Sequence, residues 1–271
     1  ARHGQGAVVL VSGEAGIGKS RLVDSFVRSI AADEHVWVES LYCSPLSSNS
    51  PFYPLIEDIQ KTLGRAAGND ERHALTGLRS LLAESGAESD LAVFLLARLL
   101  SVDLPADVPQ PDLAPAAQQA KTAQLLLQLL THQQRGHPGL IIIDDLQWAD
   151  PTTLGWIDLL VGQVPTRPLL VLVTARPPCH PAWLSRPRTS AVTLGRLDAH
   201  DILAICQARC SGMTLPPEIL QHVADKTDGV PLFAEELTSM ILESGILQAE
   251  DDHYVLKGPV PTHAIPTTLQ G

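Results

Sequence analysis

A loop of eight residues, Gly13–Ser20, has the composition and spacing of a phosphate-binding loop. It reads GEAGIGKS and matches the pattern G-x-x-x-x-G-K-[ST]. Gly13 and Gly18 permit turns that a Cβ atom would obstruct, so successive backbone N–H groups can point at phosphate oxygens. Lys19 can reach the β- and γ-phosphates as a positive charge, and the Ser20 hydroxyl can ligate Mg²⁺. This stretch, here called the glycine loop, predicts a nucleoside triphosphate site; a chance match in a glycine-rich turn is the alternative.

Two adjacent carboxylates, Asp144 and Asp145, follow the aliphatic run Leu140–Ile143. A run that is apolar on both faces is typical of a central parallel strand covered by helices. Ligands bind at the carboxyl ends of such strands, so we expect Asp144 to be a second Mg²⁺ ligand and Asp145 to orient or deprotonate an attacking water. The alternative is a solvated acidic turn that caps the next helix. We call the two residues the acidic pair.

An arginine, Arg176, comes directly after another buried-looking strand, Leu169–Thr174. In that position its guanidinium could contact a γ-phosphate and respond to its loss. A surface arginine in a loop is the alternative. Lys19, Asp145 and Arg176 are therefore the predicted catalytic residues.

The surrounding pattern alternates strands with helices, which predicts an α/β fold. Val8–Val11 is a strand that leads into the glycine loop, and a helix follows it over Ser20–Ala31. A proline- and serine-rich loop then leads into several helical segments before strand character returns, and we interpret this region, about 44–135, as a helical insertion. Asp150 and Pro151 have the residue types of a helix N-cap and first helical position. The remaining predicted strands are His35–Ser40, Leu140–Ile143, Leu169–Thr174 and Ala191–Leu194, and the predicted helices of the insertion are Tyr53–Leu63, Glu71–Ala83, Asp90–Leu100 and Ala116–Gln134.

The pattern changes after residue 195. Leu197–Cys210, Pro216–Thr227 and Pro231–Ser244 are helical with no strand between them, so we expect a small helical unit. The predicted division is a core over 1–195, a helical lid over 196–247 and a linker over 248–271. The sequence stops on Thr268–Gly271 without a finished element, so we expect a truncated chain.

Composition excludes several classes of function. With 19 Lys and Arg against 30 Asp and Glu, the formal charge is −11, which disfavours a broad nucleic-acid surface or an anionic membrane as partner. The longest apolar stretches are too short to span a membrane. No secretory signal and no CxxC pair is present, so we expect a cytoplasmic protein. A zinc site is one interpretation of His200, Cys206 and Cys210, but no fourth ligand is evident. The favoured interpretation is that the two cysteines are buried core thiols.

Four segments in order resemble one family: GEAGIGKSRL, IIIDDLQWADPTTL, TARP and GVPLFAEELTSMILESG. They look like the signal-transduction ATPases with numerous domains (STAND), a branch of the AAA-related P-loop proteins. The resemblance is closest to modules fused to bacterial class III adenylyl cyclases, protein kinases or maltose-activator-type regulators. The segment CSPLSSNSPFYPLIEDIQKTLG is similar to the cyclase-associated set, so the resemblance covers nearly the whole chain.

This resemblance implies a P-loop NTPase fold of the AAA type, with five parallel strands, helices on both faces and the glycine-loop strand central. It implies that the lid turn Gly229–Pro231 approaches the nucleotide, that Arg176 is the γ-phosphate sensor, and that Trp148 and Asp150 extend the Walker B region. The expected cofactors are ATP and Mg²⁺, and the expected partners are covalently linked effector and sensor domains, with nucleotide-dependent self-association. The nucleotide-binding set is Gly13, Glu14, Ala15, Gly16, Ile17, Gly18, Lys19, Ser20, Arg21 and Pro231, and the metal ligands are Ser20 and Asp144.

The expected nucleotide is ATP rather than GTP. Asp225–Asp228 reads DKTD, which lacks the asparagine of the guanine-reading Asn-Lys-x-Asp motif and lies at the end of a predicted helix. Two functions fit the motifs: a switch that binds and slowly hydrolyses ATP, and a regulatory scaffold that holds nucleotide without hydrolysis. DNA binding by this segment is disfavoured by its acidity.

Overall fold

The computed structural model describes residues 5–30, 36–67, 71–105, 108–134, 136–210 and 212–257. It divides into two compact units, which are described separately below. The first contains the chain up to Val11 together with Ser25–Val192. The second contains Ser12–Asp24 and the chain from Thr193 onward, so the whole glycine loop belongs with the C-terminal helices. The predicted division at residue 195 stays a prediction.

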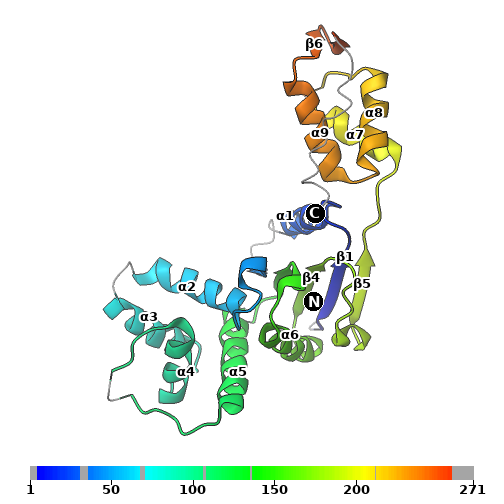
Figure 1. Ribbon diagram of the computed structural model, residues 1–271. Coiled ribbons are helices and arrows are strands. Elements are labelled where there is room, and N and C mark those ends of the chain that lie inside the picture. The colour runs from blue at the N-terminus through cyan, green and yellow to red at the C-terminus, as the bar shows by residue number, and fades with distance from the viewer. Residues whose placement is uncertain are drawn as a thin grey trace. The chain divides into compact units, whose positions relative to one another are not determined.

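Five parallel strands form one sheet: β1 (Ala7–Ser12), β2 (Trp37–Tyr42), β3 (Gly139–Asp144), β4 (Leu169–Ala175) and β5 (Thr189–Thr193), in the order β2-β3-β4-β1-β5 (Figure 1). The first five residues of β3 are buried, as expected for an aliphatic strand inside a sheet. Pairing of β2 with β3 extends from Trp37↔Gly139 to Tyr42↔Asp144. The α/β expectation is confirmed, but β4 and not β1 holds the middle position, because strand order is set by pairing between distant segments.

Among the described residues, six helices lie before β5 in the chain. They are α1 (Lys19–Ile30), α2 (Tyr53–Ala67), α3 (Glu71–Glu84), α4 (Asp90–Leu100), α5 (Pro115–Gln133) and α6 (Pro151–Gln163). Helices α2–α5 lie between β2 and β3 in the chain: α2 contacts α3, α3 contacts α4, and α4 contacts α5, which in turn contacts α6. That this region is a helical insertion stays a prediction. Short 3-10 helices lie in the described connections: η1 (Pro45–Ser47), η2 (Leu146–Trp148), η3 (Val164–Thr166) and η4 (Ala182–Ser185).

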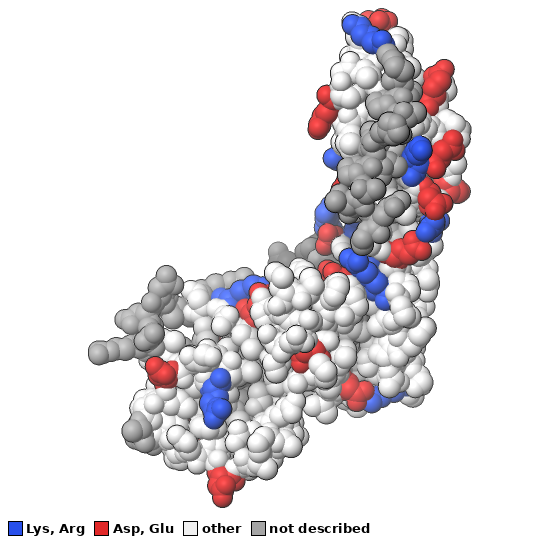
Figure 2. All heavy atoms as spheres, in the orientation of Figure 1, with Lys and Arg blue, Asp and Glu red and all other residues white. Residues whose placement is uncertain are grey.

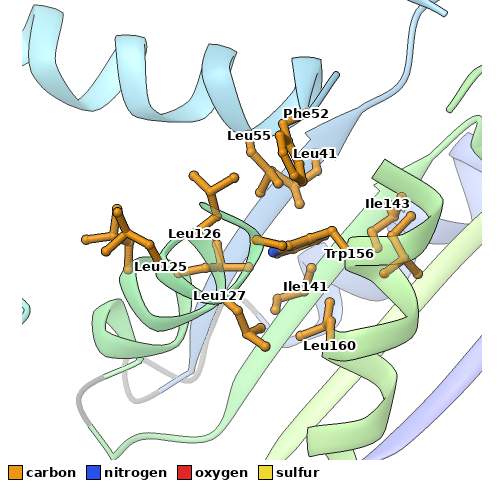
Figure 3. Packing of buried hydrophobic residues seen from close by; sticks show 14 of the residues in the cluster. Leu41, Phe52, Leu55, Leu125, Leu126, Leu127, Ile141, Ile143, Trp156 and Leu160 are labelled. Atoms are coloured by element: carbon orange, nitrogen blue, oxygen red, sulfur yellow. The ribbon is translucent and has the colours of Figure 1, made fainter. Parts of the chain in front are cut away.

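The main hydrophobic core lies where the insertion, α6 and the sheet meet. Figure 3 shows the Trp156 ring of α6 among Leu126 of α5, Ile141 of β3 and Leu41 of β2, and all four side chains are at most 2% exposed. Burial of side chains this large contributes about 1.5–3 kcal/mol each to folding. The core therefore fixes the strand that ends in the acidic pair.

The second unit has its own core of aliphatic and cysteine side chains. It is formed by α7 (Ala199–Arg209), α8 (Pro217–Thr227) and α9 (Pro231–Glu243), as the sequence predicts, and by an antiparallel hairpin of β6 (Leu247–Glu250) and β7 (His253–Leu256). The hairpin differs from the prediction, in which most of these residues belong to a linker. The rest of the predicted linker, 258–271, lies outside the described residues.

Candidate phosphate-binding loop and acidic centre

The glycine loop has the backbone conformation expected at Gly18, and a similar one at Gly16. Gly16 and Gly18 have φ angles of +73° and +102°, which residues with a side chain rarely adopt. Gly13 does not have a positive φ, but the expectation that a Cβ atom would obstruct the turn there is confirmed. Its requirement is steric instead: a Cβ atom at Gly13 would lie 2.7 Å from the Ile17 side chain and 3.2 Å from the Leu194 carbonyl oxygen.

Lys19 is the buried cation of the loop. Its side chain is folded back so that Nζ donates hydrogen bonds to the carbonyl oxygens of Gly13 and Glu14, both at 3.0 Å. The residue is 8% exposed, whereas Ser20 and Arg21 beside it are exposed. Because α1 begins at Lys19, the N–H groups of its first turn and the ammonium lie in one short segment, a combination that favours anions.

The start of α9 contacts the glycine loop within the second unit. The backbone N–H of Leu232 donates to the carbonyl oxygen of Gly16 at 3.2 Å. A Cβ atom on Gly16 would lie 2.9 Å from Cβ of Leu232, so the absence of a side chain permits this approach. Pro231 occupies the first turn of α9, where its missing N–H costs nothing. The lid turn predicted to approach the nucleotide is therefore in contact with the loop itself.

Two arginines make ion pairs around this contact. Arg21 of α1 pairs with Glu235 of α9, with Nη1 and Oε1 2.5 Å apart. Arg196, in the segment before α7, pairs with Glu14 of the glycine loop at 3.0 Å and also with Asp228. The hydrogen bonds that Arg196 donates, first to Glu14 and then to Asp228, raise its pKa, so it stays charged throughout the accessible pH range. Asp228 ends α8 in the left-handed conformation, so the DKTD segment lies at a helix terminus, as the sequence analysis placed it.

The acidic pair is held by a buried threonine of the neighbouring strand. Thr174 in β4 is fully buried, and its hydroxyl donates to Oδ1 of Asp144. The hydroxyl oxygen of Thr174 also accepts the backbone N–H of Asp145, at 2.9 Å. Asp145 has φ +58° and ψ +49°, a left-handed conformation that costs about 1–3 kcal/mol for a residue with a side chain. The threonine bond is one of the contacts that support this conformation.

A glutamine joins the acidic pair to the predicted sensor arginine. Nε2 of Gln147 donates to Oδ1 of Asp145 at 2.8 Å, and Oε1 of Gln147 accepts the backbone N–H of Arg176 at 3.0 Å. Asp144, Asp145 and Arg176 are thus brought together at the ends of β3 and β4. Sequence reasoning missed both Thr174 and Gln147, although Gln147 lies only two residues beyond Asp145.

A thiol also lies at this end of the sheet. Cys43 follows β2, and its backbone N–H donates to the carbonyl oxygen of Asp144 at 3.0 Å. Burial, and then the charges of Asp150, Asp145 and Asp144, raise the pKa of Cys43 to about 12. The thiol is therefore protonated at neutral pH and is a poor nucleophile.

Asp150 has a structural role that accounts for all its described contacts. It is 4% exposed, and Oδ1 accepts the N–H groups of Thr152 and Thr153 at 2.8 and 3.1 Å. Oδ2 accepts the Thr153 hydroxyl. These bonds cap the N-terminus of α6, which confirms the predicted cap, while Trp148 packs half-buried against the main core. That Trp148 and Asp150 belong to an extended Walker B region stays a prediction.

The cysteines of α7 are core residues. Cys206 and the adjoining Cys210 are buried in the core of the second unit, and Sγ of Cys210 donates to the Cys206 carbonyl oxygen at 3.1 Å. His200 instead lies with Asp198 and Asp201 in an exposed group, where Asp198 already caps α7. Among the described residues, no group of potential metal ligands includes these cysteines.

The surface agrees with the acidic composition. On the face drawn in Figure 2, Lys and Arg side chains are scattered among Asp and Glu, without a continuous basic area in the coloured part. Among the described helices, none combines the length and apolarity needed to cross a bilayer.

Comparison with known proteins places the chain in a family. Residues 1–172 match the family model described as AAA ATPase domain. Among curated proteins, the chain is 26% identical over 243 residues to an uncharacterised protein of Rhizobium meliloti (strain 1021), covering 89% of the chain and 23% of the relative. It is 21% identical over 236 residues to adenylate cyclase type 10 of Mus musculus, covering 85% of the chain and 14% of the cyclase. The chain thus spans less than a quarter of the length of these relatives.

Two solved structures are also similar. A signal transduction ATPase with numerous domains (STAND) that carries a tetratricopeptide repeat sensor, from Pyrococcus horikoshii, has a TM-score of 0.43 at 18% identity, covering 92% of this chain and 28% of that one. Cdc6p from Pyrobaculum aerophilum has a TM-score of 0.48 at 12% identity, covering 89% of this chain and 55% of that one.

Proposed function

The chain belongs to the AAA ATPase domain family, and from this premise we propose that it is a regulatory switch that binds ATP and hydrolyses it slowly. In this proposal the glycine loop binds the triphosphate and Lys19 contacts the β- and γ-phosphates. Asp145 orients or deprotonates the attacking water, and Arg176 contacts the γ-phosphate. The output is a change in how the C-terminal helices contact the loop.

The observation that carries the proposal is the contact of the glycine loop with α9. Lys19 donates two hydrogen bonds to carbonyl oxygens of the loop, and phosphate oxygens would compete for the same ammonium group. The next turn of the loop, at Gly16, is bonded to Leu232 of α9. A nucleotide that draws Lys19 away from the loop carbonyls therefore alters the segment to which α9 is attached.

Magnesium fits the donor set that the sequence predicts. The hydroxyl of Ser20 and the carboxylate of Asp144 are hard oxygen donors, which Mg²⁺ prefers, and the bond from Thr174 fixes the orientation of the carboxylate. When bound with ATP, the ion supplies positive charge that offsets the charge of the phosphates. Asp144 would be held in place by Thr174 whether or not the ion is bound.

The first experiment measures ATP binding by calorimetry with Mg²⁺ present. Lys19→Ala should weaken ATP binding by about 10- to 100-fold, because a hydrogen bond to a charged group contributes roughly 1.5–3 kcal/mol. Lys226→Ala, which removes an exposed lysine from α8, is the matched control and should bind as the wild type does. Equal affinity of the Lys19 variant and the wild type would refute the proposed site.

The second experiment separates a switch that hydrolyses ATP from a scaffold that only holds it. Single-turnover hydrolysis should be measurable for the wild type, and Asp145→Asn should slow it while sparing ATP binding. Binding without any hydrolysis by the wild type would favour the scaffold. We further propose that linked effector and sensor domains read the switch and that ATP promotes self-association, which size-exclusion chromatography with and without ATP would test. A cytoplasmic location stays a prediction.

A further inference from the structure

The amide of Gln147 lies between two parts of the proposed catalytic centre. One end of the amide bonds the carboxylate of Asp145 and the other bonds the backbone of Arg176, at 2.8 and 3.0 Å. The donor and acceptor roles are fixed by chemistry. An ionised carboxylate only accepts hydrogen bonds and a backbone N–H only donates, so the amide must present its NH₂ to Asp145 and its oxygen to Arg176.

We propose that Gln147 is a positioning residue that couples the water-orienting carboxylate of Asp145 to the segment that carries the sensor guanidinium of Arg176. This inference rests on the proposed function, and it adds a residue to which neither the family match nor the sequence motifs assign a role. The guanidinium projects from the residue whose N–H is bonded to Gln147. A shift of that residue toward or away from a γ-phosphate is thereby transmitted to the carboxylate through a single side chain.

The backbone supports this role for Gln147. Asp145 is in the left-handed conformation and Gln147 lies in η2, so the chain reverses direction and returns the amide to the preceding carboxylate. The bond from Asp145 N–H to Thr174 holds the start of this turn, and the cap at Asp150 holds the segment beyond it. Gln147 is therefore placed between two fixed points, as a coupling residue requires.

Two substitutions separate the two ends of the amide. Gln147→Leu removes both hydrogen bonds at similar volume. Gln147→Glu keeps an oxygen that can accept from Arg176 N–H but places a second carboxylate against Asp145. Gln124→Leu, on the exposed surface of α5, is the matched control for the first change.

The first measurement is hydrogen exchange at the Arg176 amide in the nucleotide-free protein. Pro177 and Pro178 carry no amide hydrogen, so a peptide spanning this segment reports on few sites. Exchange at Arg176 should accelerate in Gln147→Leu and stay near the wild-type rate in Gln147→Glu and in Gln124→Leu. Unchanged exchange in Gln147→Leu would overturn the proposal.

The second measurement is single-turnover hydrolysis together with ATP affinity. Gln147→Leu should lower the hydrolysis rate by about 10- to 100-fold, since the lost bond is to a charged group, and should leave ATP affinity within a factor of about two. A residue that only supports the fold would not separate the two quantities. Equal rates for the variant and the wild type, or equal losses of rate and affinity, would overturn the proposal.

Failure of this inference differs from failure of the proposed function. Hydrolysis by the wild type that is unchanged in Gln147→Leu refutes the inference alone. A wild-type protein that binds ATP without hydrolysing it refutes the proposed turnover, and the exchange at Arg176 then decides whether Gln147 joins the two segments. A wild-type protein that does not bind ATP refutes the proposed function and the catalytic meaning of the coupling together.

Discussion

Replacing Gly16 with alanine should detach the start of α9 from the glycine loop. Gly16 has φ +73°, and a left-handed residue with a Cβ atom costs about 1–2 kcal/mol. The added Cβ would lie 2.9 Å from Cβ of Leu232, closer than such atoms approach, so the loop or α9 must move. That movement also loses the Leu232–Gly16 hydrogen bond, which contributes about 0.5–1.5 kcal/mol. The expected loss of local stability is therefore about 2–3 kcal/mol.

A second glycine separates strain from the steric clash. Gly245, just after α9, has φ +75°, and among the described residues no heavy atom lies within 4 Å of a Cβ built there. Gly245→Ala should therefore cost only the conformational part, about 1–2 kcal/mol. The difference between the two variants isolates the contact between the loop and α9.

Hydrogen exchange over α9 is the appropriate assay. Tryptophan fluorescence would not report this change, because all four tryptophans lie within Ser25–Val192, in the first unit. In Gly16→Ala, the amides over 231–235 should exchange about 5- to 10-fold faster than in Gly245→Ala, which corresponds to the extra kcal/mol. Equal exchange in the two variants would refute the argument that this contact restrains α9.

Four further outcomes are expected. Thr174→Val keeps the shape of the side chain but leaves the Asp145 N–H and the Asp144 carboxylate without this hydrogen-bond partner. It should lower the free energy of unfolding, measured by urea titration, by about 1–3 kcal/mol. A change below about 0.5 kcal/mol would argue against the two hydrogen bonds. Asp150→Ala should cost about 1–2 kcal/mol through loss of the α6 cap with ATP affinity unchanged; lost turnover at unchanged stability would instead support a catalytic role. Because folding raises the pKa of Cys43 from the ordinary 9.0 to about 12, its contribution to stability is complete below pH 9 and is lost as the pH rises toward 12, and Cys43→Ala should lack this dependence. At pH 8 iodoacetamide should accordingly label the half-buried Cys179 well before Cys43, as mass spectrometry would show.

Local sequence signals predicted most of the elements. The aliphatic run of β3, the cap of α6 and the helices of both units depend on neighbours in the chain, and they lie where the pattern indicates. Two expectations about position were less accurate. β2 begins and ends two residues later than predicted, because its pairing with β3 continues to Tyr42↔Asp144. The hairpin of β6 and β7 was missed because its strands are short and largely polar.

The contacts that organise the candidate site could not be predicted in the same way. The bond from Thr174 to Asp144 joins residues 30 positions apart, and the ion pair of Arg196 with Glu14 joins residues 182 apart. Such contacts depend on strand order and helix docking, which periodicity does not encode. Gly16 illustrates the same limit, since part of its need for a bare Cα comes from the close approach of Leu232, a residue far away in the sequence.

The segment between Asp145 and Asp150 is attached at both ends, by the left-handed turn bonded to Thr174 and by the cap of α6. Its length is therefore under constraint: an inserted or deleted residue would either withdraw Gln147 from Asp145 or unseat the cap. Distant homologues that share this arrangement should preserve the interval of five positions even where the residues inside it diverge. The interval offers a fixed point for aligning sequences whose overall similarity is too low to align by other means.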